Sequence, residues 1–112
     1  MEAFKELGTF GEFEQLLKLN KRPILLSVYR DGCPICLGAA TEKAIAARYS
    51  RKVALVKMSA DDVPEIESKL NINLVPTLWL QVSKRQRTFS SVSKHDDVLR
   101  WLAEQLDEPP YR

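Results

Sequence analysis

The sequence is poor in the residues that bind metals. Among its 112 residues are two cysteines, Cys33 and Cys36, and one histidine, His95. A structural zinc site takes four cysteine or histidine ligands, so these three residues argue against a complete site within one chain. A zinc ion or cluster shared between two chains has no support in the sequence. We therefore expect no metal and no other cofactor, and we interpret His95 as a surface residue before a helix.

An excess of charge and long apolar runs are also missing. Lysine and arginine number 17 and aspartate and glutamate 15, so the formal net charge is +2, too small for nucleic-acid binding by bulk electrostatics. No segment approaches the roughly 18 apolar residues that span a membrane, and the first residues include early acids and no apolar run of a secretory signal. We expect a cytoplasmic protein that binds neither nucleic acid nor membranes.

The two cysteines are separated by two residues in the stretch YRDGCPICLGAA. In a reducing compartment a C-x-x-C pair rarely serves as a structural staple, and so small a loop would restrict the unfolded chain little. Two interpretations remain at this point. Cys33 and Cys36 are a redox pair, or they are two small apolar-like thiols in a core.

Hydrophobic patterning predicts nine elements in the order βαβαβαββα. Strands linked by helices favour parallel pairing with right-handed crossovers, whereas the last two strands read as an antiparallel hairpin around the polar turn SKRQ. We therefore predict an α/β domain at residues 1–108, with a mixed sheet of four to five strands, helices on both faces and a tail at 109–112. The expected strands are residues 2–7, 23–29, 52–58, 77–82 and 87–92, and the expected helices are residues 9–20, 34–49, 60–70 and 96–106.

Helix ends carry their own signals. Thr9 and Glu12 have the spacing of a capping box, and we expect the same helix to end at Asn20. Asp61 or Asp62 is expected to cap the short third helix.

The cysteines follow the apolar strand at 23–29, and Pro34 suits the first turn of the next helix. On this layout Cys33 lies at a helix amino end, where free N–H groups and the helix dipole stabilise a thiolate. Cys36 would lie one turn inside the helix, shielded and placed to attack a mixed disulfide formed at Cys33. A C-x-x-C motif in a βαβ setting is typical of thiol redox proteins.

Three motifs, ILLSVYRDGCPIC, VALVKMSADD and LVPTLWL, occur in this order and together make the chain resemble the thioredoxin family over nearly all its length. The resemblance implies the thioredoxin fold, with Cys33 as nucleophile and Cys36 as resolving thiol.

The same resemblance implies a cis peptide bond before Pro76, beside the cysteines. It also implies that the Val75 backbone hydrogen-bonds an extended substrate segment, as in strand addition. The residues expected to contact a substrate are Gly32, Pro34, Ile35, Val75 and Pro76.

The chain departs from the family pattern at several supporting positions. The buried acid usual before the motif is replaced by Ser27, which cannot accept a proton at neutral pH, while its usual partner matches Lys57. With the acid missing, Lys57 is equally compatible with a side chain that extends from a strand end to solvent. Tyr29 stands where the family often has tryptophan, and we interpret it as a packing residue. The usual glycine before the last helix is replaced around residues 91–92.

The active-site motif has a proline, Pro34, directly after the first cysteine, and in this it is more similar to the motif of glutaredoxins. The glutathione-binding Gly-Gly pair near the last helix is missing, however, because the glycines are Gly8, Gly11, Gly32 and Gly38. The additional amino-terminal βα unit also resembles thioredoxins. We expect a thioredoxin-like protein with a glutaredoxin-like dipeptide between its cysteines.

Two functions fit the sequence. The first is an oxidoreductase that acts on protein disulfides through Cys33 and Cys36, with a thioredoxin-reductase-type or glutathione-type electron donor. The second is a binding module with little or no redox activity, which holds partner proteins in the groove around Gly32, Ile35 and Val75.

Overall fold

The computed structural model of the protein describes residues 3–90 and 92–107. The expected tail at 109–112, the domain end at 108 and Ser91, the first of the two residues around which the glycine is replaced, lie outside the described residues. No helix in the described part is both long and apolar enough to cross a membrane.

The elements follow the order expected from the sequence. The five strands are β1 (Lys5–Glu6), β2 (Ile24–Tyr29), β3 (Ala54–Ser59), β4 (Thr77–Val82) and β5 (Arg85–Phe89), and the four helices are α1 (Phe10–Leu19), α2 (Ala39–Tyr49), α3 (Glu65–Lys69) and α4 (His95–Leu106).

All five strands form one mixed sheet in the order β1-β3-β2-β4-β5. Strands β1, β2 and β3 are parallel, and β4 runs antiparallel to both β2 and β5. The central position of β2 explains its continuous apolar run, because both of its faces are covered. The prediction of a mixed sheet of four to five strands is confirmed.

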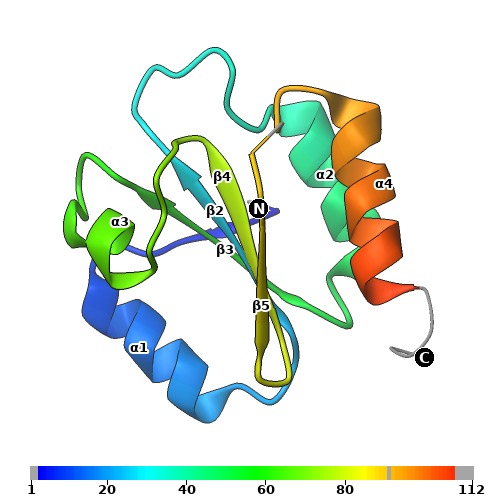
Figure 1. Cartoon of the computed structure of the whole chain (residues 1–112). Helices are drawn as coiled ribbons and strands as arrows, with labels where there is room; N and C mark the ends of the chain where they lie inside the picture. Colours follow the sequence, from blue (N-terminus) through cyan, green and yellow to red (C-terminus); the bar gives the residue numbers. More distant parts are fainter. Residues whose placement is uncertain (1–2, 91, 108–112) are drawn as a thin grey trace.

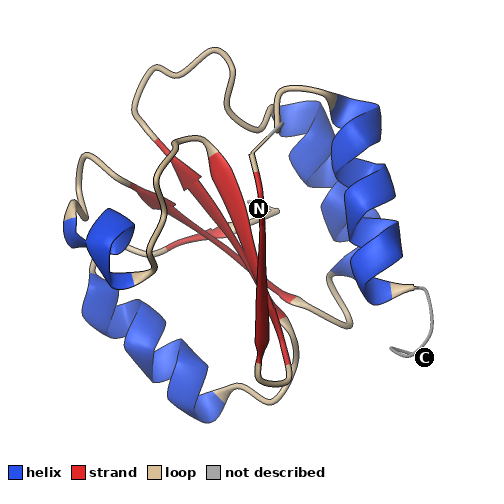
Figure 2. Cartoon of the chain, in the orientation of Figure 1, coloured by secondary structure: helices blue, strands red, loops and turns tan. Residues whose placement is uncertain are grey.

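Helices cover both faces of the sheet (Figures 1 and 2). Helices α1 and α3 lie over one face, where Phe13 packs edge-on against Trp79 in the core. Helices α2 and α4 lie side by side over the other face, where Ile45 and Leu102 are buried in a second core. The sheet is thus packed against helices on both faces, and the loops that follow its strands begin from well-packed strand ends.

The capping box at α1 is confirmed. The backbone N–H of Glu12 donates to Thr9 Oγ1 at 3.2 Å, and the Thr9 N–H donates to Glu12 Oε1 at 3.1 Å. Asn20 ends the helix, as expected.

Three local predictions were wrong. Helix α2 begins at Ala39 and not at Pro34, because Gly38 takes an extended conformation with φ −82° and ψ 163°, which glycine adopts at little cost. Neither Asp61 nor Asp62 caps α3, whose amino end is Pro64.

The hairpin is also tighter than predicted. Val82 pairs with Arg85, so the turn is Ser83–Lys84, and Ser83 has a positive φ of 56°. Strand β5 therefore begins two residues before the predicted strand.

Candidate active site

The cysteines lie in a loop between the carboxyl end of β2 and the start of α2. Cys33 and Cys36 form a disulfide, with their Cα atoms 5.5 Å apart, and both residues are partly exposed. The expectation that Cys36 is shielded from solvent is therefore not met in this oxidised state.

The expectation that Cys33 opens a helix was also wrong. Helix α2 begins at Ala39, six residues after Cys33. The dipole effect is confined to the first turn of a helix, so α2 does not supply the charge stabilisation that we expected for a Cys33 thiolate.

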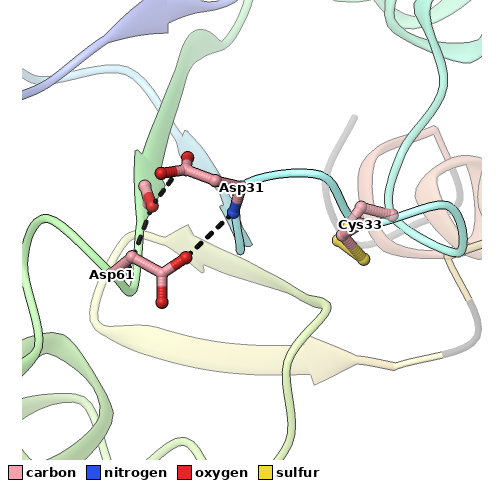
Figure 3. Close-up of a disulfide and its surroundings, with 5 residues drawn as sticks. Asp31, Cys33 and Asp61 are labelled. Atoms are coloured by element: carbon pink, nitrogen blue, oxygen red, sulfur yellow. Dashed lines mark hydrogen bonds between the residues drawn. A yellow bond between two sulfur atoms is a disulfide. The ribbon is translucent and has the colours of Figure 1, made fainter.

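The loop before Cys33 is anchored to the end of β3 (Figure 3). The backbone N–H of Asp31 donates to Asp61 Oδ2 at 3.0 Å. The fully buried Ser59 donates from Oγ to Asp31 Oδ1 at 3.3 Å, and Ser59 Oγ accepts from the Asp61 N–H at 3.2 Å. These three bonds fix the chain two residues before the nucleophile candidate, and sequence reasoning missed Ser59 and Asp61.

Arg30 is held by two carboxylates. Its Nη1 lies 3.1 Å from Asp61 Oδ1, and its Nη2 lies 3.2 Å from Glu67 Oε1. The guanidinium charge is thus compensated by two acids from the β3–α3 segment, so Arg30 acts as a further anchor of the loop.

A pocket of about 430 Å³ lies directly beside the disulfide. It brings together seven of the residues selected from the sequence: Ser27, Tyr29, Gly32, Cys33, Pro34, Cys36 and Lys57. Arg30, Asp31, Leu37 and Glu42 complete its lining. Ile35 lies outside this pocket, with 58% of its surface exposed.

Val75 and Pro76 do not line this pocket either. Their peptide bond is cis, as the resemblance implied. Thr77 pairs with Val28 in the sheet, so the cis bond lies near the same strand end from which the cysteine loop leaves. The preceding Leu74 is 63% exposed, and its carbonyl accepts from Thr77 Oγ1 at 2.5 Å.

Two residues that line the pocket, Glu42 and Lys57, form an ion pair. Ser27 is buried, and it lies opposite Lys57 in the register between strands β2 and β3. Lys57 Nζ lies 3.8 Å from Glu42 Oε1, and each of these two side chains is only 18% exposed. Lys57 is therefore not simply a strand-end lysine that extends to solvent.

Sequence reasoning missed Glu42, although the sequence held a signal for it. Ile45 and Tyr49 are buried on α2, and Glu42 precedes them by three and seven residues. This spacing places an acid on the face of the helix that packs against the sheet.

Tyr29 ends β2, and its hydroxyl donates to Glu6 Oε1 at 2.7 Å. Burial raises the pKa of the Tyr29 phenol far above its usual value, and the hydrogen bond to Glu6 raises it further. The phenol therefore stays protonated at neutral pH and links β2 to β1, which agrees with its interpretation as a packing residue.

His95 is the first residue of α4 and lies within hydrogen-bond distance of α2. Its Nδ1 is 2.8 Å from Thr41 Oγ1. Within residues 3–90 and 92–107, no three histidine, cysteine or acidic side chains are grouped so that they could hold a metal ion.

A family model described as thioredoxin matches residues 6–104 of the chain. The chain belongs to the thioredoxin family. Its disulfide-bonded C-x-x-C pair is consistent with thiol–disulfide oxidoreductase chemistry, and its sheet and helices are those of the thioredoxin fold.

Individual members of the family are moderately similar to the chain. Glutaredoxin-3 of Homo sapiens is 34% identical over 76 residues, which are 67% of this chain but 23% of that protein. Thioredoxin of Rickettsia bellii is 28% identical over 97 residues, which are 84% of this chain and 91% of that protein. The crystal structure of thioredoxin from Trypanosoma brucei brucei has a TM-score of 0.78 at 18% identity and covers 94% of this chain and 92% of its own. The chain thus spans about a quarter of glutaredoxin-3, and the structural likeness shows the fold.

In the pocket beside the disulfide, the polar groups come from both the sheet and a helix. Strand β2 contributes the hydroxyl of Ser27, and helix α2 contributes the carboxylate of Glu42.

Proposed function

We propose that the protein is a thiol–disulfide oxidoreductase in which Cys33 is the nucleophile and Cys36 is the resolving thiol. The observation that carries the proposal is the Cys33–Cys36 disulfide at the edge of a pocket, in a chain of the thioredoxin family.

The reaction follows from the two thiols. In the reduced protein, the Cys33 thiolate attacks one sulfur of a substrate disulfide, a mixed disulfide forms, and the other substrate sulfur leaves as a thiolate. Cys36 then loses its proton and attacks Cys33, which releases the second substrate thiolate. Two electrons pass to the substrate, and the Cys33–Cys36 disulfide seen in the structure is the product.

The substrate groove is proposed to include Gly32, Pro34, Ile35, Val75 and Pro76. The exposure of Ile35, which lies in the cysteine loop, and of Leu74, which precedes Val75, supports this assignment because both side chains offer apolar surface to a partner. A substrate segment in extended conformation would add hydrogen bonds to the Val75 backbone.

The proposed substrates are protein disulfides, and the proposed electron donor is of the thioredoxin-reductase or glutathione type. A cytoplasmic location belongs to the same proposal, since a reducing compartment returns the disulfide to the dithiol.

A binding module with little turnover is the second candidate. One observation favours it: Ser27 in the pocket has no group that accepts a proton from Cys36 at neutral pH. Such a module would hold partners in the same groove without redox cycling.

The reduction potential of the cysteine pair tests the proposal first. The protein is equilibrated with defined thiol buffers, quenched with an alkylating reagent, and analysed by mass. A reversible two-electron transition between the potentials of thioredoxins and glutaredoxins is expected. No reversible disulfide would reject the redox role and leave the binding module.

Turnover gives the second test. Reduction of insulin disulfides by the protein is expected to disappear in Cys33→Ser, whereas Cys36→Ser should still form a trapped mixed disulfide. Insulin reduction that is unchanged in Cys33→Ser would contradict the assignment of the nucleophile.

A further inference from the structure

Resolution of the mixed disulfide requires a group that accepts a proton from Cys36, and neither Ser27 on β2 nor Lys57 on β3 is such a group. Cys36 must lose a proton before it attacks the mixed disulfide at Cys33. Ser27, from the centre of β2, lines the pocket beside Cys36 but stays neutral and cannot take this proton. Lys57, opposite Ser27 on β3, is a donor and not an acceptor when charged.

Glu42 supplies a carboxylate in the same pocket. It lines the pocket together with Cys36 and Lys57, and its Oε1 lies 3.8 Å from Lys57 Nζ. Both charged side chains are largely buried, at 18% exposure each, where charges interact more strongly than in bulk water. The pocket that both groups line, at about 430 Å³, has room for water.

The position of Glu42 is set by the late start of α2. With Ala39 as the first helical residue, Glu42 falls in the first turn, where the helix dipole favours a negative charge. Its backbone N–H donates to the Gly38 carbonyl at 2.9 Å. Because Ile45 and Tyr49 are buried on the same side of α2, the carboxylate is directed toward the sheet and Lys57.

We propose that Glu42, held by Lys57, is the group that accepts the proton of Cys36 during resolution of the mixed disulfide. This inference rests on the proposed oxidoreductase function. Cys36 Sγ gives its proton through water to the Glu42 carboxylate and forms a bond to Cys33 Sγ. The bond between Cys33 and the substrate sulfur breaks, and the substrate sulfur leaves with the electron pair and takes up a proton. Lys57 is a positioning residue in this step.

The two chemical steps can be observed separately with dithiobis-nitrobenzoate as the substrate disulfide. The reduced protein should release one coloured thiolate when Cys33 attacks and a second when Cys36 resolves. Stopped-flow absorbance records both phases, and a Cys36→Ser variant identifies the first because it lacks the second.

In Glu42→Gln the second phase is expected to slow about tenfold at pH 7, a modest loss for a general base, while the first phase keeps its rate. The acidic limb of the pH profile of the second phase, which a carboxylate base produces, should disappear. Glu14→Gln, on the exposed surface of α1, is the matched control and should change neither phase.

A rescue variant separates chemistry from structure. Position 27 lines the same pocket and faces Lys57 across the strands, so Ser27→Asp in the Glu42→Gln background should restore the second phase by at least about threefold. If Glu42→Gln does not fold, Glu42→Asp keeps the charge but withdraws it by one methylene, and its second phase should be slower than that of the unmodified protein.

An unchanged second phase and an unchanged pH profile in the folded Glu42 variant would overturn the assignment of Glu42. Slowing without rescue by Ser27→Asp would also count against proton acceptance and favour a packing role. By contrast, absence of both phases in the unmodified protein would reject the proposed function itself, so the two failures are distinguishable.

Discussion

Two short segments flank Cys33, and they are held by different means. The upstream segment, residues 30–32, is tied to the β3–α3 region by hydrogen bonds from Arg30 and Asp31. The downstream segment, residues 34–38, has the side chains of proline, isoleucine, cysteine, leucine and glycine. Cys36 is joined to Cys33 by the disulfide, and the other four residues have no side-chain group that can form a hydrogen bond.

This difference indicates how the loop can work as a redox site. The upstream segment holds the chain before Cys33 at the end of a strand, through hydrogen bonds that do not involve the disulfide. The downstream segment depends on the disulfide and on the start of α2, so reduction is expected to affect residues 34–38 more than residues 30–32.

The largest effect is expected from Asp61→Ala, which removes the main upstream tie. Asp61 accepts from the Asp31 N–H at 3.0 Å and pairs with Arg30 at 3.1 Å. Hydrogen bonds to charged groups contribute more than neutral ones, but these groups are half-exposed, so we expect a loss of about 2 kcal/mol in the free energy of unfolding. Urea denaturation measures this as a lower midpoint at constant slope.

The neighbouring Asp62→Ala is the matched control, because the Asp62 side chain is exposed. It should change the free energy of unfolding by under about 0.5 kcal/mol. Equal losses in the Asp61 and Asp62 variants would mean that local charge, and not the anchor, stabilises the upstream segment.

The two glycines of the loop give the next comparison, starting with Gly32. No atom lies within 4 Å of a Cβ built there, but the residue has φ +68°, a conformation that disfavours side chains. Gly32→Ala should therefore destabilise the protein by about 1 kcal/mol. Gly32→Asn should cost less, since asparagine tolerates this region, and an equal cost in thermal or urea unfolding would point to a cause other than backbone strain.

Gly38 should respond in the opposite direction. It has φ −82° and precedes the first residue of α2 without a side-chain cap, and a Cβ there would have open space. Gly38→Ser supplies a cap and restricts the unfolded chain, so we expect a gain of about 0.7 kcal/mol. Gly38→Ala, which has no hydroxyl, is the control; if it stabilises as much as serine, capping is not the reason.

The fold was predictable because apolar runs and helix-capping motifs are local patterns that recur along the sequence. The apolar run of β2 predicted a central strand, and the Thr9–Glu12 spacing predicted a capping box that the structure contains. The start of α2 was not predictable from helix propensity. Pro34 and the alanines after it favour a helix, but Gly38 takes an extended conformation.

The candidate site was predictable only in part. The cysteines, Ser27 and Lys57 were recognised from motifs in the sequence. The structure places all four at one pocket. Glu42 and Asp61 enter the site from other elements, and their contacts with Lys57 and Asp31 depend on how α2 and the β3–α3 loop pack. Such contacts between distant segments follow from tertiary packing and leave only a weak local signal.

The smallest effect is expected at Tyr29, which ties the end of β2 to Glu6 just before the upstream segment. Tyr29→Phe removes a 2.7 Å hydrogen bond and should cost about 0.5 kcal/mol at pH 7. Burial and the bond to Glu6 raise the folded-state pKa of Tyr29 above that of the unfolded chain, which is about 10. The contribution is therefore complete below about pH 10 and decreases as the pH rises toward the folded-state value. Urea midpoints of both proteins from neutral to alkaline pH should converge above about pH 10, and a difference that stays constant there would mean that the hydroxyl does not hold this end of the strand.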